Sequence, residues 1–296
     1  MTGSAVVVSG GLDGSLLGQV NEVIDTIDIS ETSRCQYKRE VLPFLRWLGP
    51  NQLHPNVLLD YKRYLQSRTD VGTGTKSKYL TVARVFLREL YRLRVIPLDV
   101  TAGIRSFRMT RPHKKSPITD EEIRRLWEYL DSPEADPRAR VIIGLMYYQG
   151  LRRVEVGRLR IEDFNPGAKT LLVWGKGRDD KEVVDCHPKM VVVLSEYLSR
   201  TQLRSGPLFP SRKRGKGESL SSNMIYRLVM KVHRQLGITK NVHGYRKVFT
   251  SKLIESGLNL LEVQSYTRHR DVSQLQVYYD RLDKTKTLPT YYATFE

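Results

Sequence analysis

The sequence is poor in cysteine and has no long apolar segment, and both absences exclude classes of protein. Its two cysteines, Cys35 and Cys186, lack the Cys-x-x-Cys spacing of zinc and redox motifs, so we expect ordinary thiols and no metal site. No uninterrupted apolar run is long enough to span a bilayer. The Gly/Ser-rich start also lacks the basic region of a secretory signal. These features indicate a cytoplasmic protein in which residues 1–19 form a flexible leader.

Motifs for metal- or ATP-dependent phosphate chemistry are also absent. Two-metal nucleases gather carboxylates around their ions, whereas the acidic pair Asp179-Asp180 falls in a predicted turn, where aspartate is common. A Walker loop needs glycine, lysine and then serine or threonine. Here Lys76-Ser77 follows a threonine, and Gly215-Lys216 is followed by another glycine. Neither segment fits, so we expect no cofactor.

The chain has instead a large excess of positive charge. Its 296 residues carry a formal net charge of +17, and 40% of them are hydrophobic, which is enough for packed cores. The length favours two domains. A charge excess of this size indicates a polyanionic partner, and nucleic acid is a better candidate than an anionic membrane. A merely solvated basic surface is the ordinary alternative.

The first half of the chain, residues 20–107, has a mostly helical pattern. Apolar residues recur at the spacing of one helix face, with a Gly/Thr-rich loop over 72–75. We interpret this half as a helical DNA-binding domain with basic faces. Its predicted helices cover 32–47, 55–66, 76–93 and 100–104.

A basic segment with two prolines, residues 108–117, follows this domain. We interpret it as an interdomain linker, because a basic linker between two basic domains suits a clamp around a duplex. Its cations would bind phosphate and would not read sequence. The candidate DNA contacts are Lys76, Lys78 and Arg84 in the helical domain and Arg108, Arg111, Lys114 and Lys115 in the linker.

The second half, residues 118–283, combines helices with one β-hairpin. Thr119 and Glu122 have the spacing of a capping box and predict a helix start. A tail, 284–296, ends the chain with several apolar residues that need burial, on their own domain or on a neighbouring protomer. Helices are predicted over 118–130, 138–148, 153–159, 188–198, 220–236, 243–257, 260–267 and 272–283, and strands over 170–174 and 182–186.

Four short motifs in this half supply cations, imidazoles and a tyrosine. Cleavage of a phosphodiester needs a nucleophile, neutralisation of the charge on the non-bridging oxygens, and a proton for the leaving oxygen. The set can supply all three. The motifs are Gly-Leu-Arg-Arg-Val-Glu at 150–155, Gly-Lys-Gly at 175–177, His-Gly-Tyr-Arg at 243–246, and His269 followed by Tyr278 in the next predicted helix.

In this order the motifs resemble those of the tyrosine recombinases, which include phage integrases and transposon resolvases. The resemblance covers about residues 118–280, while the first half is similar in organisation only. It implies a mainly α fold with a small β-hairpin sheet, built as a two-domain clamp of core-binding and catalytic domains. Arg268 stands where the family often has glycine, so we expect an altered local backbone there but intact chemistry.

The resemblance also assigns roles to the motif residues. Two arginines would flank the scissile phosphate, because guanidinium is planar and always charged. The histidines would bind the phosphate or move the tyrosine proton, and a lysine would protonate the departing 5′ oxygen. The candidates are Arg152 and Arg246 with Glu155 in support, His243 and His269, Lys176 as the acid, and Tyr278 as the nucleophile.

Several of these assignments have competitors. A lone lysine is usually solvated, and a lone histidine often caps a helix or lies in a core, so His243 has an ordinary structural alternative. The competing residues are Arg153 for Arg152, Lys181 for Lys176 and Tyr279 for Tyr278.

The implied reaction joins the DNA 3′ phosphate to tyrosine and frees a 5′ hydroxyl, without metal or ATP. A homotetramer would exchange strands of two specific double-stranded DNA sites through a Holliday junction, on the nucleoid. A type IB topoisomerase would use the same chemistry without synapsis. A non-catalytic DNA-binding regulator on the same fold is a further alternative.

Overall fold

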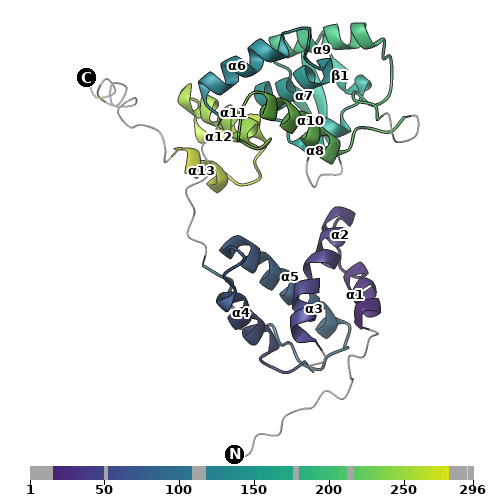
Figure 1. The fold of residues 1–296 in the computed structure, drawn as a ribbon, viewed down its shortest axis with the longest axis vertical. Helices are drawn as coiled ribbons and strands as arrows, with labels where there is room; N and C mark the ends of the chain where they lie inside the picture. The colour runs from purple at the N-terminus through teal and green to yellow at the C-terminus, as the bar shows by residue number, and fades with distance from the viewer. Residues whose placement is uncertain are drawn as a thin grey trace, which may run out of the picture. The chain divides into compact units, whose positions relative to one another are not determined.

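The chain folds as two compact units, each with its own hydrophobic core (Figure 1). The computed structural model describes residues 16–49, 53–108, 118–175, 180–211, 217–279 and 292. The units comprise Met1–Lys114 and Lys115–Glu296. The boundary between them falls inside the predicted linker, most of which lies outside the described residues.

In the part of the first unit that the structure describes, the regular elements are all helices. The long helix α5 buries an apolar stripe that includes Leu80, Phe86 and Leu87, and an aromatic group joins α3 to α4, with the rings of Phe44 and Tyr61 centred 5.0 Å apart. Packing of these faces forms the core. The helices are α1 (Leu16–Asp25), α2 (Glu31–Glu40), α3 (Leu42–Leu48), α4 (Val57–Ser67) and α5 (Thr73–Arg92).

Three predictions for this unit are wrong in detail. The single helix expected over 32–47 is two helices, because Pro43 has no N–H to continue the first and instead stands at the start of the second. The expected loop over 72–75 is mostly the first turn of α5, which begins at Thr73. Residues 100–104 form turns and no helix.

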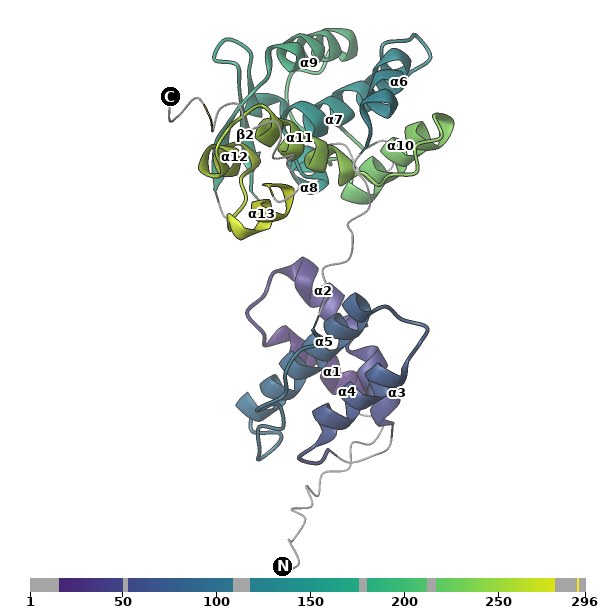
Figure 2. The same cartoon turned by 90° about the vertical axis from the view of Figure 1, so that its left-hand side faces the viewer.

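The second unit is built around α7, a helix buried on nearly every side. Ala139, Ile142 and Leu145 are fully buried, and α6, α8, α9, α10 and α11 all pack against this helix (Figure 2). The capping box predicted at Thr119 and Glu122 is present at the start of α6. The helices are α6 (Asp120–Leu130), α7 (Pro137–Tyr148), α8 (Arg153–Arg158), α9 (Pro188–Thr201), α10 (Ser222–Gln235), α11 (Gly244–Glu255), α12 (Leu260–Thr267) and α13 (Ser273–Tyr279).

A small antiparallel sheet lies beside these helices. The predicted hairpin is present as β2 (Thr170–Trp174) and β3 (Lys181–Asp185), with Trp174 opposite Lys181. A third strand, β1 (Phe164–Asn165), pairs with β2 after the 3-10 helix η1 (Ile161–Asp163). Two residues are too few for an alternating pattern, which explains why the sequence did not predict β1. The predicted mainly α fold with a small sheet is confirmed.

The last helices form a small group of their own. Figures 1 and 2 both show α12 and α13 beside α11. Their contact is a separate cluster of Ile254, Val263 and Leu275, with Tyr278 packed against it. The described part of the helix predicted over 272–283 is α13, and residues 280–283 lie outside the described residues.

Candidate active site

The first catalytic motif is shaped by a glycine turn. Gly150 has a φ of +58°, in the left-handed region that glycine enters without strain. A Cβ at this position would lie 2.3 Å from Cδ1 of Phe249. Only glycine fits this close approach, and the turn brings Arg152 to the N-terminal cap of α8.

Glu155 holds Arg152 in place through two contacts. Its carboxylate accepts the backbone N–H of Arg152 at 2.8 Å and the Nη1 of the same residue at 2.7 Å. The Glu155 side chain is 1% exposed, whereas that of Arg152 is 27% exposed. The guanidinium is therefore fixed from inside the protein and still reaches the surface.

The competitor Arg153 points elsewhere. Its guanidinium lies 5.3 Å from the ring centre of Tyr226 on α10, which is the geometry of a cation–π contact. Of the two neighbouring arginines, Arg152 is the one joined to the other motif residues.

Arg246 is buried and links three parts of the site. Its Nη1 donates to the Gly150 carbonyl oxygen at 2.6 Å, and its Nη2 donates to the Thr267 carbonyl oxygen. Burial, and then the charge of Arg152, lower the pKa of Arg246 to about 9. The group is therefore still charged at neutral pH, and it ties the turn before α8 to the end of α12.

His269 lies beside this guanidinium in a neutral form. Burial, followed by the charges of Arg246, Arg152 and His243, lowers its pKa to about 4. Its Nδ1 is 2.6 Å from Oγ1 of Thr267, which itself donates to the Val263 carbonyl oxygen at 2.7 Å. Because that hydroxyl has one proton, Nδ1 must be the donor and Nε2 the unprotonated nitrogen.

His243 precedes α11 and is exposed. Its exposure argues against the core alternative, and no side-chain hydrogen bond caps the helix. Its charge acts on His269. His243 and His269 therefore lie near each other although they come from different parts of the chain, before α11 and after α12.

Tyr278 is half-buried on α13, against the small cluster that joins α11 to α12. Its phenol is close enough to Arg246 to raise the pKa of that guanidinium, against the larger effect of burial. The structure thus brings together five of the six predicted catalytic residues: Arg152, Arg246, His243, His269 and Tyr278.

The sixth, Lys176, lies outside the described residues. Its competitor Lys181 forms an ion pair with the buried Asp163 and lies 5.7 Å from the Trp174 ring centre. Lys181 is therefore engaged within the protein. The proton donor stays a prediction.

The predicted DNA contacts in the first unit have partners inside that unit. Lys76 donates to the Gln66 carbonyl oxygen at 3.2 Å, and Lys78 lies 2.9 Å from the Glu40 carboxylate. Arg84 donates to the Ile104 carbonyl oxygen at 2.9 Å. Arg108 is exposed, whereas Arg111, Lys114 and Lys115 lie outside the described residues. Their role in DNA binding stays a prediction.

Other features of the described residues bear less on this site. No group of three His, Cys, Asp or Glu side chains in the described part of the chain could hold a metal ion. No described helix is long and apolar enough to cross a membrane.

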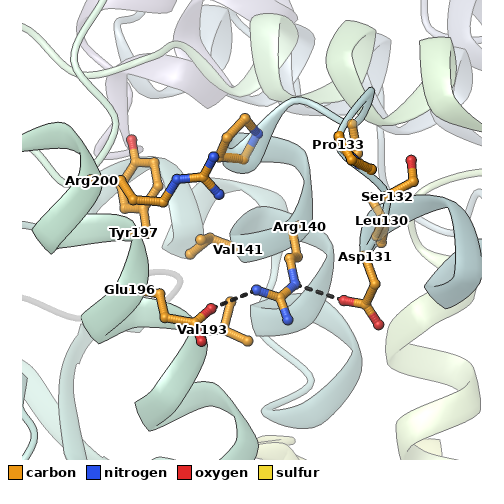
Figure 3. A pocket seen from close by; sticks show the side chains of 12 residues that line it. Leu130, Asp131, Ser132, Pro133, Arg140, Val141, Val193, Glu196, Tyr197 and Arg200 are labelled. Carbon is orange, nitrogen blue, oxygen red and sulfur yellow. Dashed lines mark hydrogen bonds and ion pairs between the residues drawn. The ribbon is translucent and has the colours of Figure 1, made fainter.

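A hollow elsewhere in the second unit contains Arg140 between Asp131 and Glu196, each 2.8 Å away (Figure 3). No motif residue lines it.

The contacts of Arg268 within the site were not predicted. Arg268 adopts the left-handed conformation, with φ 55° and ψ 43°. The expected difference from the backbone of the family stays a prediction. A non-glycine residue holds the conformation that glycine favours. Its side chain joins the site through Glu155, at 2.6 Å. The sequence signal was only its position between Thr267 and His269.

These residues lie within the part of the chain, residues 117–285, that matches the model of the phage integrase family. The chain belongs to the phage integrase family. The tyrosine recombinase XerD of Pseudomonas putida is 29% identical over 266 residues, which are 84% of this chain and 87% of that protein. The tyrosine recombinase XerA of Pyrococcus furiosus is 32% identical over 162 residues, 54% of this chain and 56% of that protein.

Solved structures share the fold at low sequence identity. The Tn1549 transposon integrase in complex with transposon right end DNA has a TM-score of 0.74 at 10% identity, and the match covers 95% of this chain and 99% of that one. XerH recombinase bound to difH substrate has a TM-score of 0.69 at 19% identity, covering 95% and 85%. Family and relatives together confirm the predicted tyrosine recombinase.

Gly150→Ala should destabilise the second unit more than Gly257→Ala. Both positions have positive φ, which costs an alanine ~1 kcal/mol. Gly257 has open space around it, whereas Gly150 faces the Phe249 ring, a clash that adds about 1–3 kcal/mol. Urea unfolding of the two variants measures the difference, and equal losses would show that the ring moves freely.

DNA binding should be coupled to proton uptake by His269. Its pKa of about 4 lies below the ordinary value near 6.5, because burial and neighbouring cations disfavour the charged form. A bound phosphate favours that form and raises the pKa, so the complex takes up protons at about pH 5.5. Calorimetry of DNA binding in buffers of different ionisation enthalpy measures this uptake. His269→Gln should reduce it, and an unchanged uptake would assign it to another group.

Proposed function

We propose that this site-specific recombinase cleaves and rejoins DNA through a covalent bond between Tyr278 and the 3′ phosphate. The observation that carries the proposal is that Tyr278 shares one site with two arginines and two histidines from separate elements. Duplex DNA is the substrate, as the net charge of +17 also favours.

In the proposed cleavage step, the Tyr278 oxygen attacks phosphorus in line with the bond to the 5′ oxygen. The tyrosine–phosphorus bond forms, the bond to the 5′ oxygen breaks, and a 5′ hydroxyl leaves. A tyrosine with an ordinary pKa of about 10 is ionised in roughly one molecule in a thousand at neutral pH. The neighbouring guanidinium of Arg246 favours the phenolate, and His243 accepts the proton.

The two arginines neutralise charge on the non-bridging oxygens. Arg152 has the more exposed side chain and makes direct contact with phosphate, while the buried Arg246 also orders the backbone around it. His269 donates to the phosphate from Nε2 once it has gained the second proton. Lys176 supplies the proton to the leaving 5′ oxygen.

Rejoining reverses this step with a new strand. A free 5′ hydroxyl attacks the phosphotyrosine, the phosphodiester forms again and the tyrosine is released. The bond energy is kept in the phosphotyrosine, so ATP is not needed. Two such exchanges on paired duplexes pass through a Holliday junction, and we propose a homotetramer as the synaptic assembly, acting on the nucleoid.

A type IB topoisomerase or a DNA-binding regulator would fit less well. The family match favours recombination, and a regulator would not need a phenol beside a buried guanidinium. A covalent-adduct assay separates a regulator from both enzymes, and a two-site recombination assay separates recombinase from topoisomerase.

Tyr278→Phe should bind recombination-site DNA but form no covalent adduct, because it lacks the attacking oxygen. Tyr279→Phe is the matched control and should form the adduct. The measurement is trapping on nicked DNA followed by denaturing electrophoresis. The opposite pattern would assign the nucleophile to Tyr279.

Lys176→Ala should cleave slowly, and a substrate with sulfur in place of the 5′ bridging oxygen should restore the rate. A thiolate leaves without a proton, so a general acid is no longer needed. Lys181→Ala is the control. The cleavage rate is measured in single-turnover assays with both substrates. If the sulfur substrate restores the rate of Lys181→Ala and not that of Lys176→Ala, the general acid is Lys181.

Truncation after Asp283 should spare binding to one half-site and weaken filling of the second. The removed tail contains Tyr292, whose side chain is 58% exposed in the single chain, and docking on a neighbouring protomer would bury it. Gel shifts on half and full sites test this. If the truncated protein fills both half-sites as cooperatively as the intact protein, the tail does not couple neighbouring protomers.

A further inference from the structure

Arg268 combines a strained backbone with a buried charge. The described residues include four non-glycine residues with positive φ, and the other three, Arg94, Lys169 and Gln202, are exposed. The Arg268 side chain is only 6% exposed. Burial of a charged group is unfavourable unless other charges compensate it, so both features need a reason.

Two carboxylates compensate this charge. Nη2 of Arg268 donates to Oε2 of Glu155 at 2.6 Å, and its Nε lies 2.9 Å from Oε1 of Glu182 on β3. Glu155 is also bound by the backbone and side chain of Arg152. Glu155 therefore accepts three hydrogen bonds from two arginines, and the four side chains together are electrically neutral.

We propose that Arg268 is a positioning residue that holds Glu155, and through it Arg152, in the orientation needed for cleavage. This inference rests on the phosphate-binding role proposed for Arg152. Arg268 fixes one oxygen of the carboxylate, so that the other stays directed at the Arg152 guanidinium. Glu182 anchors Arg268 in turn to the sheet.

Sharing the carboxylate also has an electrostatic effect. If Glu155 were paired with Arg152 alone, its negative charge would offset most of the field that Arg152 presents to a phosphate. The second guanidinium takes up part of that negative charge. Burial raises the pKa of Glu155, but Arg268 and the Arg152 hydrogen bonds outweigh it and keep the carboxyl ionised.

Arg268 does not reach the substrate itself. Its guanidinium faces two carboxylates inside the protein. Of the two arginines paired with Glu155, Arg152 is the one whose side chain is exposed. Its loss should therefore change the rate of cleavage and not the affinity for DNA.

Arg268→Gly is the first test, because glycine keeps the left-handed backbone without strain and removes only the side chain. We expect single-turnover cleavage of nicked recombination-site DNA to slow about 10- to 100-fold, as for a misplaced catalytic group, with unchanged affinity. Lys169→Gly relieves the same backbone strain at an exposed position and should cleave at the wild-type rate. A wild-type rate in Arg268→Gly would overturn the proposal.

The double variant with Arg152→Ala shows whether Arg268 acts through Arg152. Losing one preorganised charge donor typically slows cleavage by about 10²–10³. If Arg268 acts through Arg152, the double variant should be about as slow as Arg152→Ala alone. If the double variant is slower than Arg152→Ala by the same factor that Arg268→Gly loses on its own, the two residues act independently and the positioning role is overturned. A wild-type rate in Arg152→Ala alone would instead overturn the role proposed for Arg152.

Glu182→Gln keeps the test decisive if the glycine variant unfolds. This substitution removes the charge that pairs with Arg268 without creating a cavity. We expect slower cleavage at unchanged affinity for DNA. In the Arg152→Ala background, Glu182→Gln should not slow cleavage further. Urea unfolding, measured alongside, separates instability from misplacement. Cleavage by Glu182→Gln at the wild-type rate would overturn the proposal.

Discussion

The active site depends on the two hydrogen bonds of one buried guanidinium. Arg246 donates to the carbonyl oxygens of Gly150 and Thr267, which lie far apart in the sequence. The first carbonyl precedes Arg152 and the second precedes Arg268 and His269. An interior arginine can satisfy backbone carbonyls and stay charged, so one side chain both orders the backbone and contributes charge.

The site gathers more positive charge than its own carboxylates balance. Arg152, Arg246 and Arg268 lie around Glu155, with Glu182 on the far side of Arg268. Burial is the largest cause of the lowered pKa values of Arg246 and His269, and the neighbouring cations lower both values further. Each cation raises the cost of charging its neighbour. An anionic phosphate relieves that repulsion. In the proposed mechanism the substrate phosphate supplies the negative charge that the site lacks, and cations already in position stabilise it.

Much of this could be predicted from sequence, and the failures have physical causes. The motif residues and most helices follow local rules of spacing and capping, so their elements could be predicted. Sequence alone left Arg153 as a competitor of Arg152, and the structure shows Arg153 against the Tyr226 ring instead. The ion pairs of Arg268 were not predicted because its partners, Glu155 and Glu182, are distant in sequence. The same holds for Lys78, whose partner Glu40 lies on another helix. Long-range ion pairs leave no periodic pattern.

The helix α13, which carries Tyr278, packs on a small cluster that is separate from the main core of the second unit. The main core of the second unit includes residues from each of the helices α6 to α11. In the described residues, α13 packs on a separate cluster of Ile254, Val263 and Leu275, with Leu253, Leu258 and Leu260 against it. An element with few buried contacts opens at lower free energy than the core does. We therefore expect α13 to open more readily than the main core of the unit. Substitutions in the main core should lower the stability of the whole unit. Substitutions in this cluster should instead change how often α13 holds Tyr278, the proposed nucleophile, in its place in the site.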